Sequence, residues 1–184
     1  SPEFAAADER SACLPILDDD AAWSRLPPLE QGRRQPLPAW ARMLADSLPG
    51  ATAAMLELDA LQRQRSPLGP ALAAKVRWTA AQANHCAYSV AAAEGDLRRA
   101  GLDDAALASL ESAPATPPSE EQLILNFARR LTLEADKISD EEAARIADIL
   151  GDRNWVALVL LVRFTMAWVA MRARKPFRAG QRVV

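Results

Sequence analysis

Residues 71–102 read ALAAKVRWTAAQANHCAYSVAAAEGDLRRAGL, and this stretch decides the fold class. Its apolar residues recur every three or four positions, which is the spacing of one face of an α-helix. Pro70 precedes the stretch and suits the first turn of a helix, and Gly101 suits the position just after a helix end. The pattern therefore predicts helices over 70–83 and 85–100, with Asn84 as the N-cap of the second.

Helical spacing continues along the rest of the chain, without the sustained apolar–polar alternation of strands. Capping boxes are expected at Ser119 with Gln122 and at Ser139 with Glu142, each followed by a helix. The remaining predicted helices cover residues 21–26, 38–48, 51–63, 102–110 and 152–174. The 51–63 helix carries its apolar face on Ala54, Met55, Leu58 and Leu61. The last helix is apolar nearly all round, which is typical of a central helix.

The chain divides into four expected regions. Residues 1–4 read SPEF and are interpreted as a cloning scar. The natural N-terminus can then be missing, and whether a leader was removed with it is left open. Residues 5–36 are expected to form an arm that contains one short helix, capped by an aspartate. The arm either packs across a neighbouring subunit or extends into solvent. Residues 37–175 form one expected helical domain, and residues 176–184 a basic tail.

Composition excludes several function classes. The 184 residues hold 22 Lys and Arg against 24 Asp and Glu, so no general attraction to nucleic acid or to an anionic membrane is expected. The longest apolar run, residues 155–171, is interrupted by Arg163, which favours a buried helix over a membrane span. Only Cys13 and Cys86 are cysteines, so no disulfide framework is expected, and a reducing, cytoplasmic location fits.

The segment around Cys86 resembles the core of the carboxymuconolactone decarboxylase and alkylhydroperoxidase-D-like superfamily. In that superfamily a helix leads into a Cys-x-Tyr-Cys-x-x-x-His motif, and the next helix ends in a small residue, Gly and Leu. Residues 126–132 and 139–142 also suit the family. The resemblance implies an all-α, multi-helix bundle of the alkylhydroperoxidase-D-like type and a homo-oligomer, either a dimer or a trimer.

The resemblance also shows which catalytic groups this chain lacks. Cys86 falls on the first cysteine of the motif and Tyr88 on its tyrosine, but Ser89 falls on the second cysteine and Ala93 on the histidine. Ala74 falls on the upstream glutamate of the family peroxidases. Those enzymes oxidise one thiolate to a sulfenic acid, resolve it with the second thiol, and move protons through the Glu and His. The two-cysteine cycle therefore cannot operate within this chain.

Cys86 itself has two open interpretations. A position in the first turn of a helix favours negative charge on its sulfur and hence reactivity. Its place on a stripe with Val90, Ala93 and Leu97 instead favours a buried, inert side chain.

Each neighbouring candidate also has a functional and a structural interpretation. His85 either assists Cys86 or serves as a capping or surface residue, and Glu94 either replaces the missing histidine or is a solvated acid. Tyr88, Ser89 and Trp78 either line a pocket or contribute to packing. No metal site and no cofactor are predicted, because the chain has one histidine, one cysteine near it and no carboxylate cluster at ligand spacing.

These observations predict a divergent domain without the dithiol centre, acting as a binding, scaffolding or regulatory module with a possible protein partner. One alternative is a one-cysteine, thiol-dependent peroxidase that uses Cys86. A second is a cofactor-free decarboxylase-like enzyme, for which the expected acid–base residues are missing. The C-terminal cations are interpreted as a helix end and a solvated tail rather than a nucleic-acid surface; they are Arg172, Arg174, Lys175, Arg178 and Arg182.

Overall fold

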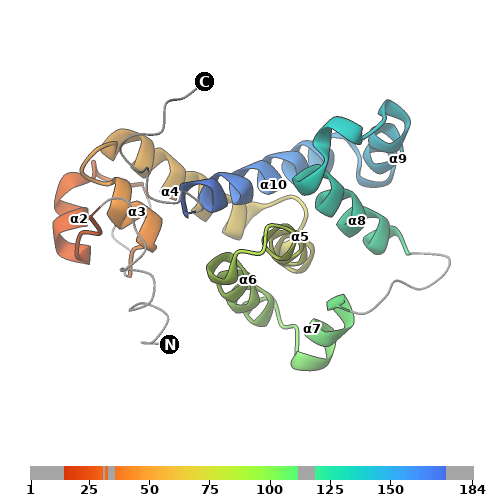
Figure 1. Ribbon diagram of the computed structural model, residues 1–184, viewed down its shortest axis with the longest axis horizontal. Coiled ribbons are helices and arrows are strands. Elements are labelled where there is room, and N and C mark those ends of the chain that lie inside the picture. Colours follow the sequence, from red (N-terminus) through yellow and green to blue (C-terminus); the bar gives the residue numbers. More distant parts are fainter. Residues whose placement is uncertain (1–14, 31, 33–35, 112–118, 173–184) are drawn as a thin grey trace, which may run out of the picture. The chain divides into compact units, whose positions relative to one another are not determined.

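The computed structural model describes residues 15–30, 32, 36–111 and 119–172. These residues form nine α-helices and one short 3₁₀-helix and no strand, so the all-α prediction is confirmed (Figure 1). The chain divides into two compact units, residues 1–61 with 170–184, and residues 62–169. The expected cloning scar, Cys13 and the expected tail at 176–184 lie outside the described residues.

In the first unit, helix α2 (Asp19–Arg25) packs beside helix α3 (Ala39–Leu44). Asp18 accepts a hydrogen bond of 2.7 Å from the Ala21 amide, which confirms the predicted aspartate cap. Trp23 and Trp40 are buried. The short helix within the predicted arm therefore packs against α3.

Helix α4 (Pro49–Arg65) begins two residues earlier than expected, with the Pro-Gly pair inside its first turn. The predicted apolar face is wrong, because Leu58 and Leu61 are 39% and 44% exposed, whereas Thr52 and Ala53 are buried. Thr52 can be buried because its hydroxyl donates a 2.8 Å hydrogen bond to the Leu48 carbonyl. The spacing of apolar residues alone did not predict which side of α4 packs against other helices.

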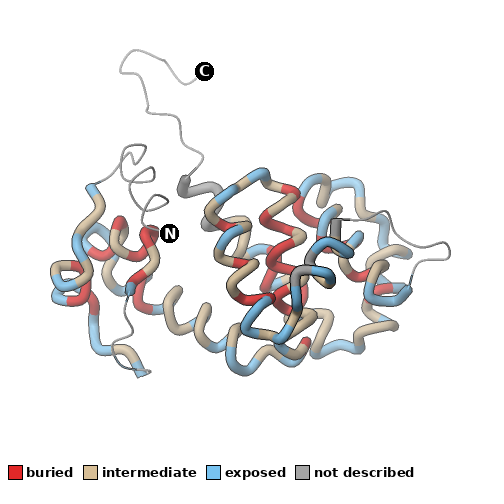
Figure 2. The backbone as a smooth tube through the Cα atoms, turned by 90° about the horizontal axis from the view of Figure 1, so that it is seen from below, coloured by how far each residue is buried: buried red, intermediate tan, exposed pale blue. Residues whose placement is uncertain are grey.

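The second unit is built on helices α5 (Pro70–Ala83), α6 (Ala87–Arg99), α7 (Asp104–Glu111), α8 (Glu120–Leu133), α9 (Asp140–Leu150) and α10 (Asp152–Arg172). Helix α5 packs against both α6 and α8, and α8 packs against α9. Figure 2 shows buried positions recurring among intermediate and exposed ones along several helices, as amphipathic helices require. The larger core joins α5, α8, α9 and α10 through Val76, Ile124, Phe127, Leu131, Ile146, Leu158, Leu161 and Val162.

Of the two predicted capping boxes, the one at Ser119 is complete and the one at Ser139 is half formed. Ser119 and Gln122 form the complete capping box, whereas Ser139 accepts a 3.2 Å hydrogen bond from the Glu142 amide. Arg130 of α8 pairs with Glu142 of α9 and also donates to the Lys137 carbonyl at 3.0 Å. These contacts fix where α9 starts relative to α8.

Helix α10 is only partly the central helix that its composition predicted. Leu158, Leu161 and Val162 are buried, whereas Val156 and Leu160 are more than half exposed. Within the described residues, no helix has both the length and the apolar character needed to cross a membrane.

Candidate functional site

The turn between α5 and α6 places Cys86. Asn84 caps the end of α5, where its side-chain amide donates a 3.0 Å hydrogen bond to the Ala80 carbonyl. The prediction that Asn84 starts the next helix is therefore wrong. His85 follows with a φ of 52°, a left-handed conformation that only a few non-glycine residues adopt. This reversal turns the chain, and α6 begins only at Ala87.

Cys86 is the N-cap residue of α6 rather than a residue of its first turn. Its amide donates to the Ala81 carbonyl at 3.2 Å, and its own carbonyl accepts from the Val90 amide at 2.9 Å. Its side chain is half-buried, so the thiol is neither open to solvent nor sealed in a core. The Ser89 hydroxyl donates a hydrogen bond of 3.2 Å to the Cys86 sulfur.

The two positions to which the sequence resemblance assigns a proton relay hold buried alanines. Ala74 of α5 and Ala93 of α6 are 2% and 3% exposed, and both belong to one apolar cluster with Trp78 and Leu97. Val90, Ala100, Leu102 and Leu110 pack around that cluster. The methyl groups are therefore part of a filled helix–helix contact. Trp78, 6% exposed, packs in this contact.

The other candidate residues differ in how far they are buried. His85 is exposed on the turn, and Glu94 and Tyr88 are half-buried on α6. The Ser89 hydroxyl contacts Cys86, as described above. In the described part of the chain, no three His, Cys, Asp or Glu residues gather closely enough to hold a metal ion.

A buried ion cluster at the other end of α6 was not predicted. Asp96 is 7% exposed, and its carboxylate pairs with Arg63 of α4, with Arg77 of α5 at 3.5 Å, and with Arg99 of α6. Arg77 is also 7% exposed. Asp96 lies on the same buried face of α6 as Ser89 and Ala93, at helical spacing. A carboxylate on a buried face needs basic partners, and this pattern could have indicated the cluster.

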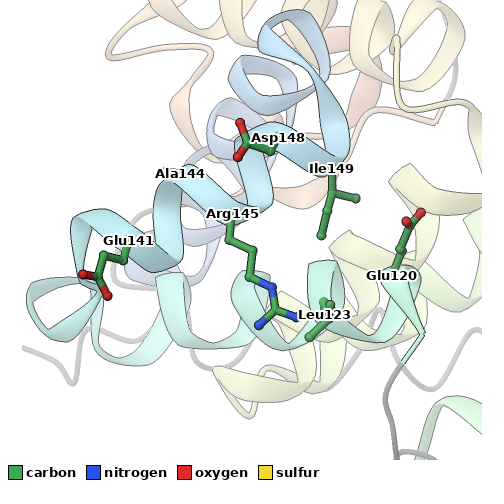
Figure 3. A pocket seen from close by; sticks show the side chains of 7 residues that line it. All are labelled: Glu120, Leu123, Glu141, Ala144, Arg145, Asp148 and Ile149. Atoms are coloured by element: carbon green, nitrogen blue, oxygen red, sulfur yellow. The ribbon is translucent and has the colours of Figure 1, made fainter.

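A surface hollow of about 770 Å³ lies between α8 and α9 (Figure 3). Leu123, Ala144 and Ile149 form its apolar part. Its charged lining residues are Glu120 of α8 together with Glu141, Arg145 and Asp148 of α9. The hollow therefore combines an apolar surface with three carboxylates and one guanidinium. The sequence contained no motif for it, because it arises from the way two helices meet.

Comparisons with protein-family models, with curated proteins and with solved structures found no match to this chain. The class that the fold defines is therefore an all-α protein.

Proposed function

We propose that this chain is a binding or scaffolding module, a divergent relative of the alkylhydroperoxidase-D-like proteins that has lost their dithiol chemistry. The observation that carries the proposal is the closed contact around Ala74 and Ala93. General acid–base catalysis needs an ionisable side chain within hydrogen-bonding reach of the reacting group. In this chain, the positions that resemble the relay carry methyl groups buried beside Trp78 and Leu97.

Peroxide turnover tests this proposal directly. The purified full chain, supplied with an organic hydroperoxide and a dithiol, is expected to consume peroxide no faster than the matched Cys86→Ser variant. The reason is that Ser89 cannot resolve a sulfenic acid and no buried relay group moves protons. The added dithiol can itself reduce a sulfenic acid, so the assay tests whether Cys86 is oxidised at all without a proton relay. Residual peroxide is measured by a colorimetric assay over time. Rapid turnover that disappears in Cys86→Ser would refute the proposal.

A second candidate function, a one-cysteine peroxidase, is favoured by the hydrogen bond from Ser89 to Cys86. A helix N-terminus and a hydrogen-bond donor beside the sulfur are features of many reactive cysteines. The Cys86 thiolate would attack the hydroperoxide, break its O–O bond and release an alcohol, leaving a sulfenic acid. One external thiol would then form a mixed disulfide with loss of water, and a second would release the thiol of Cys86 and a small disulfide.

Removal of the serine hydroxyl tests this second candidate. In a Cys13→Ser background, Ser89→Ala is expected to slow alkylation of Cys86 about fivefold at neutral pH, which corresponds to about 1 kcal/mol for one hydrogen bond. The rate is followed by mass spectrometry. Ser109→Ala is the matched control, because that hydroxyl donates to the Ala106 carbonyl on α7 and not to the thiol. If Cys86 reacts only after denaturation, the one-cysteine function is excluded.

A further inference from the structure

The charged groups of the α8–α9 hollow have no ion-pair or hydrogen-bond partner within the described residues. Three carboxylates, those of Glu120, Glu141 and Asp148, outnumber the single guanidinium of Arg145. Figure 3 shows Glu120 and Asp148 at separate places around the apolar side chains of Leu123 and Ile149. A cationic partner can therefore bind these acids without first breaking an existing pair.

Charge is distributed unevenly along this chain. Residues 119–150 hold eight acidic and four basic residues, a net charge of −4. Residues 163–184 hold six basic residues and no acidic one. Within that second stretch, residues 172–182 carry five cations together with Phe177. The chain thus contains both an acidic surface with an apolar part and a basic segment with an apolar residue.

We propose that the α8–α9 hollow binds the basic segment 172–182 of a second copy of this chain. Arginine guanidinium groups suit carboxylates because they can donate two parallel hydrogen bonds to one carboxyl group. Apolar atoms of the segment would cover the side chains of Leu123 and Ile149. The inference names the partner for the binding role proposed above, and in that respect it rests on that role.

This contact is head-to-tail, because the hollow and the segment are different surfaces of the same chain. An open assembly of any length leaves one hollow and one segment unused at its two ends, so the association extends with concentration. Attraction between partly exposed charges also weakens with ionic strength, since added ions screen them.

Sedimentation of the full chain gives the first test. The weight-average mass is expected to rise with protein concentration at about 0.05 M salt and to return to that of a monomer at about 0.5 M salt. A monomer at every concentration in low salt would overturn the inference, including the case in which a chain binds its own segment. Assembly that persists unchanged at high salt would overturn it as well.

Complementary variants give the decisive test. Asp148→Arg changes the net charge of the hollow lining from −2 to 0, and Arg174→Glu with Arg178→Glu reverses two cations of the segment. Each variant alone is expected to self-associate at least about tenfold more weakly. Their equimolar mixture is expected to form a heterodimer, because one variant keeps an intact segment and the other an intact hollow.

Asp136→Arg is the matched control, since Asp136 is exposed in the 3₁₀-helix (Ala135–Lys137) outside the hollow lining. It makes the same charge change and is expected to leave self-association unaltered. Circular dichroism verifies that every variant is folded. A mixture that stays monomeric, or a control that dissociates as Asp148→Arg does, would overturn the inference. Peroxide turnover would instead refute the proposed function and leave this result untouched.

Discussion

Replacing Asp96 with alanine is expected to lower the free energy of unfolding by about 3–5 kcal/mol. The Asp96 carboxylate pairs with Arg63, Arg77 and Arg99, and so connects helices α4, α5 and α6. Arg77 is 7% exposed and would keep its charge in a largely dry environment after the carboxylate is lost. Because whole domains are stable by about 5–15 kcal/mol, this single change removes a large fraction of the total. Urea unfolding followed by circular dichroism measures it.

Two matched variants separate the buried charge from ordinary surface effects. Glu94→Ala removes a half-buried carboxylate from the same helix, one for which the described residues supply no ion pair, and should change stability by less than about 0.5 kcal/mol. Arg99→Ala should cost less than about 1 kcal/mol, because the Arg99 side chain is 70% exposed. A loss below about 1 kcal/mol for Asp96→Ala would mean that water already screens the cluster.

Helix ends with strong local signals were predicted well. The 70–83 helix matches α5, and Gly101, with a φ of 88°, lies just past α6. Ser119 also forms its predicted box. In each case one residue favours its position for a local reason, such as the fixed φ of proline, the free φ of glycine or a hydroxyl that accepts from an amide. Such signals do not depend on the rest of the fold.

The turn before Cys86 was predicted less well, because asparagine suits both ends of a helix. At the start its side chain accepts from an amide, and at the end it can donate to a free carbonyl. Asn84 donates to the Ala80 carbonyl, so α6 begins at Ala87 and Cys86 becomes its N-cap. That shift brings the Ser89 hydroxyl to the sulfur. The sequence was enough to select Cys86 and Ser89 as candidates, but the contact between their side chains could not be predicted without the geometry of this turn.

Burial on the helix faces could be predicted only in part. Ala93 and Leu97 are buried as expected, whereas the apolar face of α4 is exposed at Leu58 and Leu61. Periodicity shows that a face is apolar, but what covers it depends on partners far away in the sequence. The same limit applies to the α8–α9 hollow, whose lining comes from two helices.

Leu161→Ala is expected to lower the free energy of unfolding by about 2–5 kcal/mol. Leu161 is 1% exposed and lies in the core shared by α5, α8, α9 and α10, so its truncation leaves a cavity that the surrounding helices fill only partly. Its neighbour Leu160, on the same helix, is 53% exposed. Leu160→Ala removes the same atoms and is expected to change stability by less than about 0.5 kcal/mol.

This matched pair tests which side of α10 the protein covers. From the sequence alone, both leucines are expected to be buried, because α10 is apolar nearly all round. The structure separates them by burial alone, so equal losses for the two variants in urea unfolding would contradict the described packing of α10. At low protein concentration, only Leu161→Ala is expected to show the large loss of stability, because only Leu161 lies in the core of residues 62–169. A loss at Leu160 that appears only as the concentration rises would instead reveal an interface on the exposed side of the helix.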